Sequence, residues 1–247
     1  MKRVLLISIL LFPPLMLAIW VLFGANLMRH MANDPERKSV AERLQQYGPA
    51  SRARLKPLFE ARNISYPPAR LALVGLKSEK RLEVYASAEN KPFAFITAFP
   101  VLAASGKPGP KLREGDKQVP EGLYPIELLN PNSKFHLALR VGYPNQFDRE
   151  QARKEGRDNL GGDIMIHGSE VSIGCLAIGD AAIEDLFVLA ADTGIERITV
   201  LLSPDEFRNP SALAETNALP AWTPELYAAI KSKLQELPAP SVPSKSP

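Results

Sequence analysis

The chain of 247 residues is long enough for one main domain with a substantial hydrophobic core and shorter attachments at either end. Hydrophobic residues make up 45% of it and charged residues 23%, which excludes an extensively disordered protein. A net charge of +3, with Lys and Arg interspersed among Asp and Glu, argues against a nucleic-acid-binding protein.

The N-terminus combines a basic pair with a long apolar run. Lys2 and Arg3 precede an uncharged stretch from Val4 to Met28. At about 1.5 Å per helical residue this stretch can cross a hydrocarbon core of about 30 Å, and it is longer than the apolar region of a signal peptide. We therefore predict a signal anchor over residues 1–30, with the body of the protein outside the cytoplasm. A cleaved signal, which would release a secreted protein, is the alternative.

Residues 31–67 have the pattern of a helical stalk or lead-in. Val40, Leu44 and Tyr47 recur near helical spacing. Gly48 and Pro49 then predict a break, with a second short helix after it.

Strand patterns dominate the middle of the chain. Alternating or β-branched apolar residues between turn signals predict strands at residues 71–76, 82–87, 92–99, 123–129, 134–141, 164–168 and 197–202. The many glycines and prolines of residues 103–122 predict a long loop, and such loops in compact domains usually serve a site. Residues 142–148 are rich in turn formers and predict a turn.

Helices follow these strands. Asp180 is a favourable N-cap for a helix that would end at Gly194, and Thr223 for a C-terminal helix that would reach about Leu237. Together the elements predict an α+β fold that is mainly β. Its parts would be a main domain over residues 68–202, a helical extension over 203–237 and a disordered tail over 238–247.

One unpaired thiol stands out in this chain. Cys175 is the only cysteine, so it cannot form a disulfide within the chain. It is either a small buried hydrophobic residue or a nucleophile. Gly174 beside it would permit close approach of a substrate, and His167 stands at the end of an apolar run, where a strand would place a catalytic base. These two interpretations remain open on spacing alone.

The sequence does not favour a metal or cofactor site. One cysteine without a C-x-x-C motif and three histidines, His30, His136 and His167, would leave a zinc site to be completed by carboxylates. There is also no phosphate-cradling glycine motif and no nucleotide fingerprint. We predict chemistry without a metal or cofactor.

Four blocks of sequence, in this order, carry a resemblance to a known family: "KSEKRLEVY", "GPKLREGDKQVPEGLYPI", "FHLALRVGYPNQFDR" and "IMIHGSEVSIGCLAIGD". They resemble the YkuD-type L,D-transpeptidases, which are cysteine acyltransferases of bacterial peptidoglycan, and in particular their YafK-like branch. The resemblance covers roughly residues 68–202. It implies a β-sandwich or barrel catalytic domain with peripheral helices, here carried by an N-terminal membrane helix.

The resemblance also implies roles for individual residues. Cys175 matches the family nucleophile and His167 the general base, while the backbone N–H groups of Gly174 and Cys175 would hold the oxyanion. Two positions depart from the wider family, because Ile173 replaces a histidine and Ala177 an arginine. Both departures fit the YafK-like branch, and they make thiol acyl chemistry a firmer expectation than transpeptidation.

Four further residues are candidate substrate-binding groups: Ser172, Tyr143, Asn145 and Arg140. Each also has an ordinary structural interpretation, as a turn residue or as a solvated surface charge. A backbone carbonyl of the loop "RDNLGGD", where Gly161 and Gly162 permit close approach, is our hypothesis for the group that orients His167.

The function implied is acyl transfer or hydrolysis at the diaminopimelate carbonyl of peptidoglycan stem peptides, with cleavage weighted slightly over cross-linking. The partners would be these stem peptides and a wall-attached lipoprotein that is released. The catalytic domain would lie in the periplasm, anchored in the inner membrane. The alternative is a non-catalytic, membrane-tethered module that binds peptidoglycan.

Overall fold

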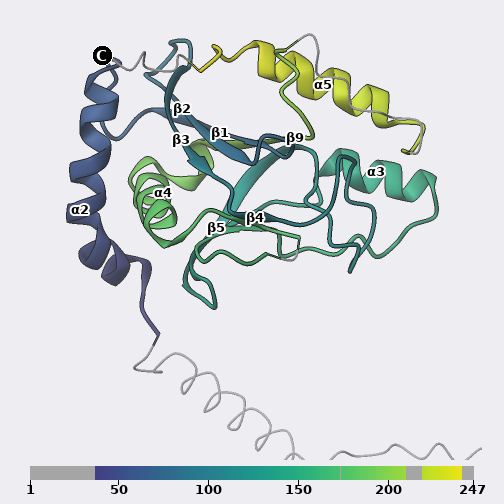
Figure 1. Ribbon diagram of the computed structural model, residues 1–247, viewed down its shortest axis with the longest axis horizontal. Coiled ribbons are helices and arrows are strands. Elements are labelled where there is room, and N and C mark those ends of the chain that lie inside the picture. The colour runs from purple at the N-terminus through teal and green to yellow at the C-terminus, as the bar shows by residue number, and fades with distance from the viewer. Residues whose placement is uncertain (1–36, 173, 210–218, 241–247) are drawn as a thin grey trace, which may run out of the picture. The chain divides into compact units, whose positions relative to one another are not determined.

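The computed structural model of the chain describes residues 37–172, 174–209 and 219–240 (Figure 1). The signal anchor predicted over residues 1–30 lies outside the described residues, as do residues 241–247 of the predicted tail. Within the described ranges, no helix is long and apolar enough to cross a membrane.

The strands of the described residues form one mixed sheet, in the order β3-β2-β1-β9-β5-β6-β7-β8-β4. The β1–β9 and β7–β8 pairs are parallel and the others are antiparallel. The strand bounds are β1 Arg70–Leu76, β2 Arg81–Ser87, β3 Ala94–Pro100, β4 Ala103–Ala104, β5 Gly122–Ser133, β6 His136–Val141, β7 Met165–His167, β8 Leu176–Ala177 and β9 Ile198–Ser203.

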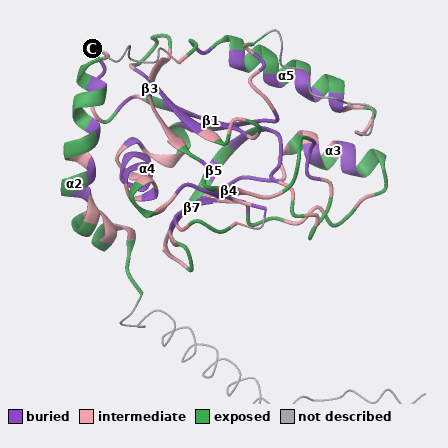
Figure 2. Ribbon diagram, in the orientation of Figure 1, coloured by how far each residue is buried: buried purple, intermediate pink, exposed green. Residues whose placement is uncertain are grey.

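Helices lie on both sides of this sheet (Figures 1 and 2). Helix α2 (Val40–Glu60) and helix α4 (Asp180–Thr193) pack on one face, and α5 (Thr223–Gln235) packs on the other. Helix α3 (Gln146–Lys154) follows β6, and a short 3₁₀ helix, Ile195–Arg197, precedes β9. This mixture confirms the predicted α+β class, while the sandwich or barrel form stays a prediction.

Strand β1 shows why its sequence is apolar throughout. Leu71 and Leu73 belong to the core under α2 and α4, whereas Ala72, Val74 and Leu76 belong to the core under α5. Successive side chains of a strand point to opposite faces, so a strand covered on both faces must be apolar at every position.

The predicted break at Gly48 and Pro49 was wrong, because α2 is a single helix that contains Pro49 and Pro57. Proline inside a helix costs about 3 kcal/mol, and tertiary contacts outweigh that cost here. Leu55 and Phe59 are buried in the core beyond the first proline.

Ion pairs also fasten the second half of α2 to α4. Arg52 Nη2 lies 2.6 Å from Asp192 Oδ1, and Arg54 Nη2 lies 2.6 Å from Asp185 Oδ1. The segment predicted as a stalk therefore packs on the same core as the sheet.

The turn predicted over residues 142–148 was partly wrong, because α3 begins within it. Asn145 accepts a hydrogen bond from the Asp148 N–H at 2.9 Å, and Asp148 accepts one in return from the Asn145 N–H at 2.9 Å. This capping box is a recognisable start signal for a helix. The caps predicted at Asp180 and Thr223 are displaced by one residue, since Gly179 and Trp222 occupy the N-cap positions.

The long loop after β4 is fixed to β1 by a buried ion pair. Lys77 Nζ lies 2.7 Å from Glu121 Oε1 and donates to the carbonyls of Gly109 and Val119 at 3.0 and 3.1 Å. The Glu121 side chain is fully buried and the Lys77 side chain is 8% exposed. Each partner therefore supplies the counter-charge that stabilises the ionised form of the other in the buried site.

We expect Lys77→Met to lower the free energy of unfolding by about 3–5 kcal/mol, because it leaves the Glu121 carboxylate buried without a counter-charge. Lys233→Met is the matched control, since the ion pair of Lys233 with Glu236 is exposed and such pairs contribute about 1 kcal/mol or less. Urea denaturation followed by circular dichroism measures both. Equal losses in the two variants would contradict the importance of the buried pair.

Candidate active site

The parallel pairing of β7 and β8 brings the cysteine and the histidine together. Ile166 pairs with Leu176 and His167 pairs with Ala177. Cys175 directly precedes β8, so it stands two positions from the level of His167 on the neighbouring strand. With about 3.3 Å per residue and about 4.8 Å between strands, this register puts the two Cα atoms about 8 Å apart.

The imidazole of His167 is held as a neutral base. Its Nδ1 lies 2.6 Å from the carbonyl oxygen of Gly168, which can only accept, so Nδ1 carries the proton and Nε2 the lone pair. Nε2 is buried and has no hydrogen-bond partner among the described residues. Burial lowers the pKa of His167, while the Gly168 carbonyl acts in the opposite direction.

The group that orients His167 differs from the one we predicted. It is the carbonyl of the next residue, Gly168, and not a carbonyl of the 157–163 loop. That loop instead approaches the thiol, because the carbonyl of Asp163 accepts from Cys175 Sγ at 3.6 Å. The loop does approach the site closely, as its two glycines suggested, but its backbone carbonyl contacts Cys175 and not His167.

The thiol of Cys175 is unpaired and partly buried. Burial raises the pKa of Cys175, and the charge of Asp163 raises it further. A hydrogen bond from the backbone at Met165 and the positive charge of Lys111 act in the opposite direction. The two pKa shifts therefore both favour the neutral forms, a thiol and an imidazole, over a thiolate–imidazolium pair.

Hydroxyl groups occupy both backbone donors that we predicted for the oxyanion. The Cys175 N–H donates to Ser172 Oγ at 3.0 Å, and the Gly174 N–H donates to Ser105 Oγ. Each hydroxyl in turn donates a hydrogen bond. Ser172 donates to the Cys175 carbonyl at 2.6 Å, and Ser105 donates to the Lys117 carbonyl at 2.8 Å. A substrate oxygen would have to displace these hydroxyls to reach the N–H groups.

The remaining predicted site residues have partners other than Cys175 and His167 in the structure. Tyr143 is buried, and its hydroxyl donates to the carbonyls of Lys111 and Leu160, each at 3.3 Å. The Asn145 side chain caps α3 and donates to the Leu123 carbonyl at 2.9 Å. Arg140 is 39% exposed and lies 3.5 Å from Asp163, beside the loop that contacts the thiol. Their roles in substrate binding stay predictions.

Two neighbours of the site were missed by sequence reasoning. Phe135 stacks on the His167 ring, with centroids 4.6 Å apart and planes 26° apart. Ser105 lies in the long loop, far from the motif in sequence, and no local pattern links it to Gly174. The prediction that this loop serves a site was the only available signal for Ser105.

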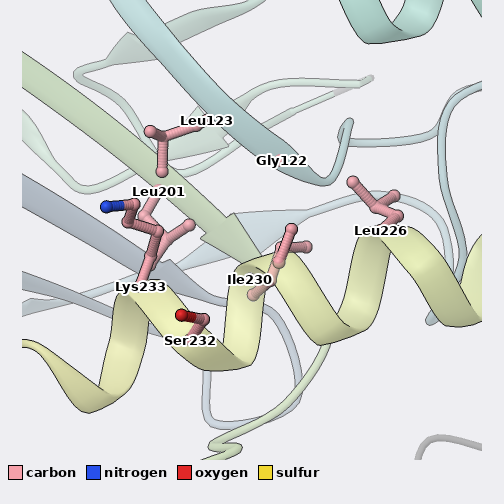
Figure 3. Close-up of a pocket in the computed structure, with 8 residues that line it drawn as sticks. Gly122, Leu123, Leu201, Leu226, Ile230, Ser232 and Lys233 are labelled. Carbon is pink, nitrogen blue, oxygen red and sulfur yellow. The ribbon is translucent and has the colours of Figure 1, made fainter.

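The site has no metal-binding character in the part of the chain that the structure describes, where no three His, Cys, Asp or Glu side chains gather in a way that could hold an ion. A separate groove of about 300 Å³ lies between α5 and strands β5 and β9 (Figure 3). Its walls are mostly aliphatic and include neither Cys175 nor His167, so it is distinct from the candidate active site.

We expect the alkylation rate of Cys175 by iodoacetamide to rise with pH around a midpoint higher than that of the same chain unfolded in urea. The physical reason is the raised pKa of the buried thiol, and the single cysteine makes the reading unambiguous. At pH 7 the folded chain should therefore react more slowly than the unfolded chain. A rate that is already maximal near pH 6 would instead indicate a preformed thiolate.

The charge of Asp163 can be tested in the same assay. Asp163→Asn should move the midpoint to lower pH, because it removes a negative charge near the thiol. Asparagine tolerates the φ of 54° at this position. Asp158→Asn, an exposed acidic residue of the same loop, is the control and should leave the midpoint in place.

Comparison of the sequence with known proteins shows similarity to a protein of one name in two strains. No family model matches the chain. It is 34% identical over 113 residues to "Putative L,D-transpeptidase YafK" of Escherichia coli K12, and the same figures hold for the protein of that name in strain O157:H7. The match covers 45% of this chain and 43% of the relative, so the chain matches less than half the length of these curated relatives.

Solved structures show weaker similarity. The helical cell shape determining protein Pgp2 of Campylobacter jejuni is 24% identical, with 55% of this chain and 48% of that one covered and a TM-score of 0.46. L,D-transpeptidase 1 of Mycobacterium tuberculosis is 16% identical, with 54% and 62% covered and a TM-score of 0.32. It is the sequence match that confirms the resemblance of this chain to the L,D-transpeptidases and, among them, to the YafK-like branch.

Proposed function

We propose that the chain is a cysteine-dependent enzyme that acts at the diaminopimelate carbonyl of peptidoglycan stem peptides. One observation carries the proposal. The single thiol of the chain directly precedes the strand that pairs with the strand of His167, and this buried histidine has a ring nitrogen that is an unprotonated acceptor without a partner among the described residues. A nucleophile and a base in this relation are what acyl chemistry requires.

In the first half of the reaction Nε2 of His167 takes the thiol proton while Sγ of Cys175 attacks the carbonyl carbon. A C–S bond forms and the carbonyl electron pair moves to oxygen, where backbone N–H groups stabilise it. The tetrahedral intermediate then collapses and the C–N bond breaks. The proton on Nε2 passes to the leaving amine, and a thioester remains on Cys175.

In the second half His167 takes a proton from the acceptor, which attacks the thioester. Sulfur leaves as thiolate and recovers the proton from Nε2. Water as acceptor gives hydrolysis, and an amine gives a cross-link or an attached protein. The resemblance to the YafK-like branch favours cleavage, including release of a lipoprotein joined to the wall, by a domain anchored in the inner membrane and facing the periplasm.

A second function, a tethered peptidoglycan-binding module without catalysis, rests on a specific observation. The thiol donates to the Asp163 carbonyl, and hydroxyl groups occupy the N–H donors of Gly174 and Cys175. A chain locked in this arrangement would bind without reacting. Exchange of these contacts for substrate contacts is therefore the step that separates the two functions.

The direct test incubates the full chain and its Cys175→Ala variant with peptidoglycan that carries tetrapeptide stems and attached lipoprotein, and reads the products by mass spectrometry. We expect released lipoprotein from the unsubstituted chain alone, because the variant lacks the nucleophile. Cross-links or D-alanine exchange would instead identify a transferase. Identical product profiles from the unsubstituted chain and the variant, both shown by circular dichroism to be folded, would contradict the catalytic function.

The occupied N–H donors lead to a second prediction. Ser105→Ala should raise kcat/KM by up to about five-fold, because a neutral hydrogen bond that the substrate no longer has to displace contributes about 1 kcal/mol. The measurement is the initial rate of stem-peptide cleavage at low substrate concentration. A large fall in kcat/KM would contradict this and show that the Ser105 hydroxyl itself serves the oxyanion.

A further inference from the structure

An aromatic side chain covers the candidate base from the tip of a neighbouring hairpin. Strand β5 ends at Ser133 and β6 begins at His136, and these two residues pair. Phe135 lies in the turn between them, where its N–H donates to Ser133 Oγ at 3.0 Å. Its ring is stacked on the imidazole of His167 with centroids 4.6 Å apart and planes 26° apart.

The position of Phe135 is unusual for a structural side chain. Turn residues of hairpins are commonly small or polar, whereas this one is aromatic and 40% exposed. It is not a member of either hydrophobic core. The aromatic ring of Phe135 contacts the imidazole of His167, so part of its apolar surface is covered by that ring.

Two contacts fix the hairpin tip in place. His136 Nε2 lies 2.9 Å from Glu184 Oε1 on α4, and the His136 ring meets Tyr47 of α2 edge-on with centroids 5.3 Å apart. His136 has a φ of 72°, a left-handed conformation that directs the chain from the turn into β6. The tip is thus held by both helices of that face.

Gly168 allows the tip to approach the base. A Cβ atom at this position would lie 2.8 Å from the carbonyl oxygen of Phe135 and 2.5 Å from Asp180 Oδ1. Both distances are too short for any side chain. The glycine that follows the histidine therefore has two functions, because its own carbonyl also accepts the Nδ1 proton of His167.

We propose that Phe135 is a positioning residue, which fixes the plane of the His167 imidazole, and with it the direction of Nε2, and shields the ring from water. The hydrogen bond to Gly168 restrains one ring atom, and a stacked ring restrains the plane, so the two contacts together define the orientation. This inference deepens the proposed function and rests on it.

Removal of the Phe135 ring has a defined electrostatic consequence. Burial is the main cause of the lowered pKa of His167, so exposure of the ring should raise that pKa toward its ordinary value. No charged side chain contributes to the shift. The ionisable groups on the elements packed around the two rings include Glu127, Lys134, His136, Arg140, Asp163, Cys175, Asp180, Glu184, Asp185 and Asp192.

The experiment compares Phe135→Ala, Phe135→Tyr and Leu128→Ala in the full chain, purified in detergent. Phe135→Tyr keeps a flat ring, and Leu128→Ala removes another exposed apolar side chain of the same hairpin, 47% exposed against 40% for Phe135. Nuclear magnetic resonance titration of the imidazole signals gives the pKa of His167. The chain has three histidines, so His167→Gln identifies its signal.

We expect Phe135→Ala alone to raise the pKa of His167. In the cleavage assay its kcat/KM should fall by roughly three- to ten-fold, the range of an aromatic contact. The acid limb of its pH profile should move to higher pH, because the base must be unprotonated to act. Phe135→Tyr should leave the pKa of His167, kcat/KM and the acid limb close to those of the unsubstituted chain.

An unchanged His167 titration in Phe135→Ala would overturn the inference, whatever its activity. A change of equal size in Leu128→Ala would also overturn it, because the effect would then belong to the hairpin and not to the ring. If the unsubstituted chain cleaves no substrate, the proposed function fails separately. The titration then decides whether Phe135 sets the environment of His167.

Discussion

The parallel pairing of β7 with β8 is the constraint on which the candidate site depends. It places Ala177 opposite His167, and therefore places Cys175, which directly precedes β8, two positions from the level of His167. A shift of this register by one residue would turn every side chain of the short strand to the other face. The pair is held from both sides, because β6 pairs with β7 and β4 pairs with β8.

Burial sets the chemical state of this site. It favours the neutral form of both groups, raising the pKa of Cys175 and lowering that of His167. Such a site holds little reactive thiolate at neutral pH, and the thiolate is the form that oxidants attack. In the proposed reaction, proton transfer from sulfur to Nε2 is therefore part of the attack on the carbonyl carbon and accompanies the development of charge on the substrate oxygen.

The sequence predicted the local elements well and their mutual contacts poorly. Short runs of mostly apolar residues between turn signals located β1 and β2, because a buried strand leaves a local pattern. The continuity of α2 through Pro49 could not be predicted, since core packing and ion pairs to α4, which is far away in sequence, stabilise it. The same limit applies to the site, where Cys175 and His167 lie in one motif but Ser105 and Phe135 arrive from separate segments.

The departure from the wider family at Ala177 has a structural consequence. This residue is fully buried, pairs with His167 across the parallel ladder and accepts the Leu102 N–H at 2.8 Å. No cation extends from this position toward a substrate, so a stem-peptide carboxylate would need a partner on another element. Arg140 of β6 is the candidate, because its side chain is 39% exposed and its distances to Glu127 and Asp163 are a loose 3.6 and 3.5 Å. A carboxylate that draws Arg140 away from Asp163 would leave the negative charge of Asp163 without that partner, which raises the pKa of the thiol further and makes its activation more dependent on His167.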